Sequence, residues 1–241
     1  MKTIIHKSEE RGIVNHGWLQ ANYSFSFSNY YDPQKLHFGA LRVLNDDVIA
    51  PKMGFGTHPH QNMEIITIPL RGVLKHRDSM HNAWQSVFPN EVQIMSAGTG
   101  VEHSEINGSI DESLNLFQIW IIPNTQNVAP RYDQKKFEPS ERDHKLQVLV
   151  SGINTADDGS LKINQDAKIS RIDLSEHTKF NYRLKSEHHG VYVMIIDGNV
   201  QISAQNLQSR DAIGISETQE FSIETVTKAQ LIFIEVPMLS L

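Results

Sequence analysis

The sequence predicts an all-β protein made of two barrel-like units, and three observations predict it. Short apolar or alternating runs recur along the 241 residues, whereas helical periodicity is nearly absent. Turn residues separate these runs, for example at residues 45–47 and 197–199. A polar segment at residues 123–145 divides the runs into two series of similar layout. Many short strands at close spacing are typical of β-sandwiches and barrels.

The expected strands of the first unit end in a run that is apolar on both faces. In order they are HFGALRV (residues 37–43), EIITIPL (64–70), EVQIMSA (91–97) and LNLFQIWII (114–122). The last run predicts a strand buried on both sides, which places Trp120 in the core. The second unit begins with KLQVLVSG (145–152), continues with a predicted hairpin at 191–203 and ends with QLIFIEV (230–236).

The segment at residues 123–145 contains three prolines and many charges and lacks alternation. We interpret it as a linker that packs over the surface. The predicted division is therefore an N-terminal metal-binding domain at residues 1–132, then a linker and a C-terminal domain without a metal site at residues 133–241.

Composition excludes several classes of function. The net charge of −6, with no cluster of Lys and Arg, argues against nucleic-acid partners. The absence of cysteine excludes disulfides, thiolate metal sites and cysteine nucleophiles. The N-terminus lacks the apolar run of a secretory signal, and no stretch approaches the ~18 apolar residues of a membrane helix. We expect a cytoplasmic protein without a membrane partner, and the sequence leaves a monomeric state open.

Two glycine-led segments carry candidate metal ligands at alternate positions. GFGTHPHQNMEI (residues 54–65) contains His58 and His60, and SAGTGVEHSEIN (residues 96–107) contains His103 and Glu105. Side chains two residues apart on a strand point to the same face, so each pair can converge on one ion. The first pair alone is a weak signal, since two surface histidines explain it equally well. Together, the pairs predict ligands on opposite walls of one barrel.

Three imidazoles and a carboxylate suit a borderline divalent ion such as Fe, Mn, Co, Ni, Cu or Zn. Without thiolates, an open catalytic site is favoured over a closed structural zinc site. Gly54 and Gly56 are expected to let the backbone turn tightly before the first pair. Pro59, which lies between the two histidines, indicates a strand start or a sheet edge.

Other polar and aromatic residues have both structural and functional interpretations. By strand parity Glu64 shares a face with His58 and His60, and we favour a role in orienting an imidazole over a fifth ligand or a solvated charge. The KHRDSMHN segment (75–82) is interpreted as a polar rim loop rather than a substrate contact. Phe25, Phe27 and Tyr30 in YSFSFSNYY (23–31) are assigned to the core rather than to a substrate platform.

These motifs resemble those of a known family. HPHQNMEIITIPLRG is similar to the first cupin motif, and GTGVEHSEIN is similar to the second. FSFSNYYDP, FGALRVLNDD and MSAGTGVEHSE resemble the pirin family, above all its bacterial branch with quercetinase activity. The resemblance is dense over residues 25–132 and looser beyond them.

The resemblance implies a bicupin, in which two jelly-roll barrels pack face to face and the N-terminal barrel holds one metal. The implied ligands are His58, His60, His103 and Glu105. Iron is the expected ion, with Ni, Co, Mn, Cu or Zn as alternatives. No metal is expected in the second barrel, where His188 and His189 are adjacent rather than alternate.

The implied activity is a metal-dependent dioxygenase that cleaves a flavonol such as quercetin and releases carbon monoxide. Its partners would be a small planar phenolic substrate and dioxygen. Glu105 would be a metal ligand and, when loosened, the catalytic base. The alternative is a pirin-type regulatory or redox-sensing protein without turnover. A cupin isomerase or sugar-binding cupin is disfavoured, because the second ligand pair is of the pirin type.

Overall fold

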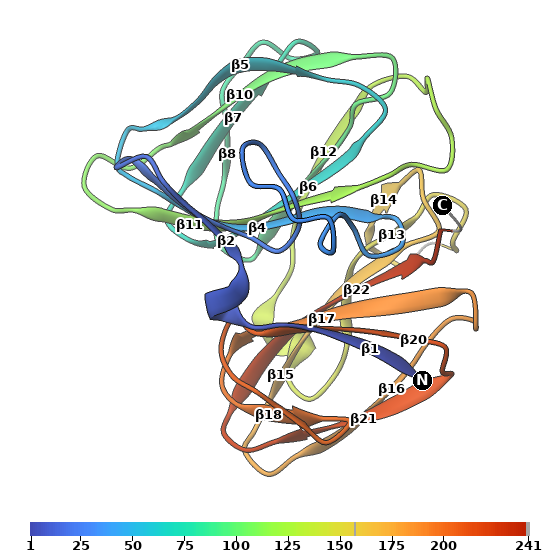
Figure 1. The fold of residues 1–241 in the computed structure, drawn as a ribbon. Helices are drawn as coiled ribbons and strands as arrows, with labels where there is room; N and C mark the ends of the chain where they lie inside the picture. Colours follow the sequence, from blue (N-terminus) through green and yellow to red (C-terminus); the bar gives the residue numbers. More distant parts are fainter. Residues whose placement is uncertain (157, 240–241) are drawn as a thin grey trace.

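The computed structural model describes residues 1–156 and 158–239 and consists of two β-barrels, one above the other in Figure 1. Each barrel pairs a seven-stranded sheet with a four-stranded sheet. This architecture confirms the predicted all-β fold with two barrels. In the described ranges the only helices are two 3₁₀ turns, η1 (Ser8–Glu10) and η2 (Pro139–Arg142), and none is long and apolar enough to cross a membrane.

The N-terminal barrel contains most of the first half of the chain. Its seven-stranded sheet has the order β12-β9-β6-β11-β4-β3-β2, and its four-stranded sheet has the order β5-β10-β7-β8. In chain order the strands are β2 (Gly12–Asn15), β3 (Leu19–Tyr23), β4 (Leu41–Ile49), β5 (Gly54–His60), β6 (Glu64–Arg71), β7 (Leu74–Asp78), β8 (Gln85–Val87), β9 (Glu91–Ser96), β10 (Val101–Asn107), β11 (Leu114–Ile121) and β12 (Arg131–Lys136).

The C-terminal barrel repeats this layout. Its seven-stranded sheet has the order β1-β20-β17-β22-β15-β13-β14, and its four-stranded sheet has the order β16-β21-β18-β19. The strands are β1 (Lys2–His6), β13 (Gln147–Gly152), β14 (Leu161–Ile163), β15 (Lys168–Leu174), β16 (Lys179–Arg183), β17 (His189–Asp197), β18 (Val200–Ile202), β19 (Gln205–Leu207), β20 (Ala212–Ser216), β21 (Glu220–Thr225) and β22 (Ala229–Pro237).

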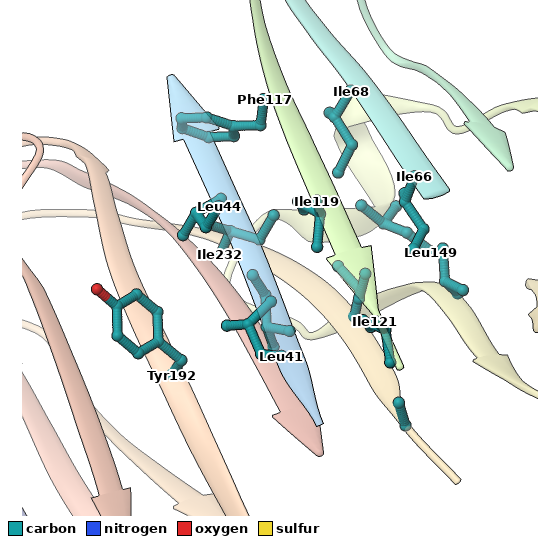
Figure 2. Close-up of a cluster of buried hydrophobic side chains, with 14 of the residues drawn as sticks. Leu41, Leu44, Ile66, Ile68, Phe117, Ile119, Ile121, Leu149, Tyr192 and Ile232 are labelled. Carbon is teal, nitrogen blue, oxygen red and sulfur yellow. The ribbon is translucent and has the colours of Figure 1, made fainter. Parts of the chain in front are cut away.

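The two seven-stranded sheets face each other across one apolar core. Phe117, Ile119 and Ile121 of β11 belong to the same buried cluster as Tyr192 and Ile232 of the second barrel. Figure 2 shows these side chains between the facing strands. Aligned packing of two sheets is the usual way in which two twisted sheets bury their apolar faces. The prediction of face-to-face barrels is therefore confirmed.

Hydrogen bonding crosses the predicted domain boundary at two places. The first strand, β1, pairs with β20 of the C-terminal barrel, so the chain starts in one barrel and crosses to the other (Figure 1). Strand β12 spans residues 132 and 133 and pairs with β9 of the N-terminal barrel. Residues 123–145, which we interpreted as a linker that packs over the surface, therefore include a strand of the N-terminal barrel at Arg131–Lys136. The segment lacks apolar alternation because β12 is an edge strand, and charged side chains protect such an edge. The division at 132/133 stays a prediction.

Gly54 permits a close approach of two strands and not the expected tight turn. It lies inside β5, where it pairs with Ile106 of β10. A Cβ atom at Gly54 would overlap the backbone oxygen of Glu105, whereas one at Gly56 would meet no atom within 4 Å. Gly54 therefore sets the spacing between β5 and β10, which are the two strands that carry the predicted ligands.

Gly54→Ala should destabilise the protein, because β5 must move away from β10, whereas Gly56→Ala should not. Overpacking at a tight contact costs about 1–3 kcal/mol. Urea unfolding of both variants measures the difference. Equal stability of the two would contradict the assigned role of Gly54.

His6, the last residue of β1, is buried and contacts residues of both barrels. Its Nδ1 lies 2.8 Å from the hydroxyl of Tyr192, and its ring contacts Phe25 edge-on at 5.7 Å. Burial, with smaller contributions from the charges of Lys35 and Arg11, lowers the pKa of His6 to about 4. The unfolded chain therefore takes up this proton first as the pH falls, since an unperturbed histidine has a pKa of about 6.5.

The contribution of His6 to stability is complete above pH 6.5 and is lost as the pH falls from 6.5 to 4. When the pH is lowered from 7.5 to 5.0, the free energy of unfolding should fall by about 2 kcal/mol less in His6→Gln than in the wild type. Urea unfolding at the two pH values measures this. His188→Gln, at an exposed position, is the control and should behave like the wild type. Equal losses in wild type and His6→Gln would refute the assignment.

Candidate metal centre

Three imidazoles converge between β5 and β10. His58 and His60 lie on β5, and His103 of β10 is the direct cross-strand partner of His58. The Nε2 atom of His103 lies 2.9 Å from Nε2 of His58 and 2.9 Å from Nε2 of His60. The ligand atoms of the three residues all lie within 4.8 Å of one another. The structure thus brings together the three predicted histidines.

The spacing and protonation of these rings fit a divalent ion. Two nitrogens bound at about 2.0–2.1 Å are roughly 2.9 Å apart when their bonds to the ion meet at a right angle. Burial, followed by the neighbouring His103 and His58, lowers the pKa of His60 to about 3. Burial, followed by His58 and His76, lowers the pKa of His103 to about 3. Both rings are therefore neutral at physiological pH, and neutral imidazole is the form that binds metal.

The tautomer of His58 is fixed by its own strand. Its Nδ1–H donates to the backbone oxygen of Gly56 over 2.8 Å. The lone pair of Nε2 is then directed towards the other two rings. A backbone carbonyl that holds the second nitrogen is the usual support of a metal-binding histidine.

Glu105 lies next to the three histidines, but its carboxylate is held from the opposite sheet. Gln118 Nε2 donates to one carboxylate oxygen over 3.0 Å, and Thr67 Oγ1 lies 3.5 Å from the other. The group of atoms within 4.8 Å of one another does not include this carboxylate. Burial raises the pKa of Glu105, partly offset by the charges of His76 and His58 and by these hydrogen bonds. Its role as fourth ligand remains a prediction.

Glu64 does not orient an imidazole, so this expectation is wrong. Its carboxylate accepts hydrogen bonds from Ser96 Oγ at 2.7 Å and from Asn164 Nδ2 of the second half of the chain at 3.0 Å. Strand parity fails because β5 ends at His60 and a turn with Asn62 in the left-handed region (φ 49°) precedes β6. Glu64 therefore faces the other barrel.

His76 and Asp78 lie on β7. The interpretation of KHRDSMHN (75–82) as a polar rim loop is therefore wrong for these two residues. They pair with Glu105 and His103 across β10, and both are buried. The His76 ring lies 5.3 Å from the His103 ring and stacks on Tyr132 at 5.1 Å and 14°. The missed signal was alternation in LKHRD, where Leu74, His76 and Asp78 are buried and the two basic residues between them are half-buried.

Two aromatic residues assigned to the core instead line a cavity beside the histidines. The Trp120 ring meets the His60 ring edge-on at 4.9 Å, and Phe27 meets Trp120 at 5.2 Å. Trp120 is half-buried. Because side chains alternate along β11, it lies on the same face as Gln118, which also lines the cavity. Phe25 is in the core as expected.

The cavity has a volume of about 540 Å³, within the usual range for small-molecule sites. Its walls are largely aromatic, from Trp18, Tyr23, Phe27, Phe55 and Trp120. Its polar lining includes His58, His60, Glu105, Gln118, Asn45 and Asp47. The arrangement places candidate ligands and a buried carboxyl group at the wall of an aromatic-lined cavity.

Comparisons with known proteins agree with this geometry. The Pirin family model matches residues 6–121, and the model of the quercetinase C-terminal cupin domain matches residues 148–236. Quercetin 2,3-dioxygenase of Escherichia coli K12 is 42% identical over 233 residues, which are 97% of this chain and 98% of that protein. A pirin-like protein of Caulobacter vibrioides is 37% identical over 94% of this chain and 96% of its own length.

A solved structure extends the likeness to three dimensions. The bacterial pirin YhhW from Escherichia coli, in complex with nickel(II), matches with a TM-score of 0.92 at 39% identity. The match covers 99% of this chain and all of that one. Sequence identity over nearly the full length and the shared two-barrel fold lead to one assignment: the chain belongs to the pirin family.

Proposed function

We propose that this protein is a metal-dependent dioxygenase that cleaves a flavonol such as quercetin with dioxygen, giving a depside and carbon monoxide. The observation that carries the proposal is the convergence of three imidazoles, two of which line an aromatic cavity together with the buried carboxyl group of Glu105. The names of relatives at about 40% identity support the same reaction. The ring carbon lost from the flavonol leaves as carbon monoxide, and both atoms of dioxygen enter the products.

The residues in and around the cavity would have separate roles in this reaction. A divalent ion held by His58, His60 and His103 would supply Lewis acidity towards an enolic hydroxyl group. Glu105 would complete the ligand set and accept the proton of that hydroxyl when loosened. Gln118 and Thr67 orient the Glu105 carboxylate through its two oxygens. The aromatic walls would hold the flat substrate and exclude water from the reacting ring.

The ligand types do not select one metal, because three imidazoles and a carboxylate suit most first-row divalent ions. Nickel(II) is bound in the pirin of Escherichia coli. Iron remains the proposed resident ion of this protein, with nickel, cobalt, manganese, copper and zinc as alternatives.

Metal-free protein should bind one Ni²⁺ or Fe²⁺ per chain in calorimetric titration under anaerobic conditions. His103→Ala should weaken this binding at least about 100-fold, since loss of groups that merely support a ligand already costs 10–100-fold. His188→Ala, in the second barrel, should bind like the wild type. Unchanged affinity in His103→Ala would rule out the site.

Metal-loaded protein should release carbon monoxide from quercetin in a 1:1 ratio with flavonol consumed. Glu105→Gln should lower kcat by about 10²–10⁴-fold, the range for loss of a general base. Headspace gas chromatography and quercetin absorbance give the two quantities. If no ion supports release in protein that binds one, the dioxygenase proposal fails and the regulatory alternative replaces it.

A further inference from the structure

A second polar group lies on the floor of the cavity, away from the histidines. Asn45 and Asp47 of β4 line the cavity and are 2% and 4% exposed. Asn45 pairs across the strands with Tyr23 on one side and Gln118 on the other, and Asp47 pairs with Leu116. Since Gln118 holds Glu105, Asn45 lies beside the candidate site and Asp47 lies one step further along the strand.

The distance from Glu105 follows from β11. Gln118 holds Glu105, whereas Leu116, two residues earlier on the same strand, is the partner of Asp47. At about 3.3 Å per residue, the two levels are roughly 7 Å apart along the sheet. A hydroxyl group on the pendant ring of a flavonol lies at a comparable distance from its enolic hydroxyl.

Asp47 and Asn45 lack the partners that buried polar groups normally have. The Oδ1 atoms of both residues are buried without a hydrogen-bond partner among the described residues. A buried polar atom without a partner costs free energy, so each such atom in a native fold requires an explanation. A ligand that donates or accepts a hydrogen bond at the cavity floor provides one.

The neighbouring Asp46 shows that only the side chains on the cavity face of β4 lack hydrogen-bond partners. Asp46 points away from the cavity, accepts a hydrogen bond from Asn115 Nδ2 at 2.8 Å and lies 3.3 Å from Arg210 Nε. Asp46 and Asp47 are thus adjacent and chemically identical, but only the one that faces the cavity has an unpaired oxygen. This makes Asp46 a matched control for Asp47.

The protonation of Asp47 is compatible with a neutral phenolic ligand. Burial, followed by the charges of Asp46 and Glu105, raises the pKa of Asp47 to about 8. At neutral pH the carboxyl group is therefore mainly uncharged, and a neutral carboxyl can both donate and accept a hydrogen bond. Such a group pairs with a hydroxyl group without burying an unpaired charge.

We propose that Asp47, together with Asn45, binds a hydroxyl group on the pendant ring of the flavonol, the ring bonded to the carbon next to the enolic one, and so determines specificity for polyhydroxylated flavonols. The inference rests on the proposed function, since it concerns the orientation of that substrate. The enolic head of the flavonol lies towards His58 and Glu105, and its pendant ring lies over the floor formed by β4.

The test uses three flavonols that share the enolic head and differ only in their pendant ring: galangin, kaempferol and quercetin, with no, one and two hydroxyl groups there. We expect the metal-loaded wild type to have a kcat/KM at least tenfold higher for quercetin than for galangin, because a site built to hydrogen-bond a hydroxyl discriminates against its absence. Asp47→Leu should raise KM for quercetin about 10–100-fold and leave galangin within threefold. Asp47→Asn should restore part of the preference, and Asp46→Asn should leave it unchanged.

Binding to metal-free protein separates this inference from the proposed function. Trp18 and Trp120 line the cavity, so quenching of tryptophan fluorescence measures the Kd of each flavonol without turnover. If no flavonol is turned over, the proposed function fails, and tighter binding of quercetin than galangin that Asp47→Leu abolishes still supports the inference. If wild type binds both equally, or Asp47→Leu weakens both equally, the inference is overturned. If Asp47→Leu does not fold, the wild-type preference and its reduction in Asp47→Asn decide the question.

Discussion

The alternation of side chains along β11 is the constraint on which the rest of the structure depends. Phe117 and Ile119 face the second barrel and form part of the core between the two sheets. Gln118 and Trp120, which lie between and beyond them, face the inside of the first barrel, where they contact Glu105 and His60. A slip of one residue would exchange these two sets of side chains. The contact between the barrels therefore fixes the register of the site.

The site also depends on the removal of water from its ligands. Burial lowers the pKa values of His60 and His103, so both rings are neutral, and neutral imidazole is the form that binds a metal ion. The close approach of β5 and β10 at Gly54 brings the ligands of the two strands together. Several buried polar atoms without partners in the described residues, among them atoms of His76, Asn45 and Asp47, lie inside the same barrel. This polar interior is characteristic of a binding site rather than of a structural core.

The second barrel has the same sheets but a different interior. Tyr182 lies parallel to Phe233 at 4.7 Å and close to parallel to Phe221 at 5.5 Å. These rings belong to an apolar cluster that fills the space between the seven-stranded and four-stranded sheets. The second barrel supports the first through the shared core and through the chain connection from β1, in the second barrel, to β2, in the first. The same arrangement of sheets thus encloses the candidate site in the first barrel and an apolar cluster in the second.

The sequence by itself predicted many of the strands, the two-barrel fold and the alternate spacing of His58 with His60 and of His103 with Glu105. These features depend on local alternation and on spacing within a strand, which the order of residues records directly. Only the tertiary structure decided which side chains face the candidate site and which face the other barrel. It turned Glu64 towards the other barrel, placed His76 beside His103 and exposed Trp120 to the cavity. The physical reason is that a turn resets strand parity, and that both faces of a central strand are buried. Sequence alone therefore cannot tell a core face from a face that lines a site.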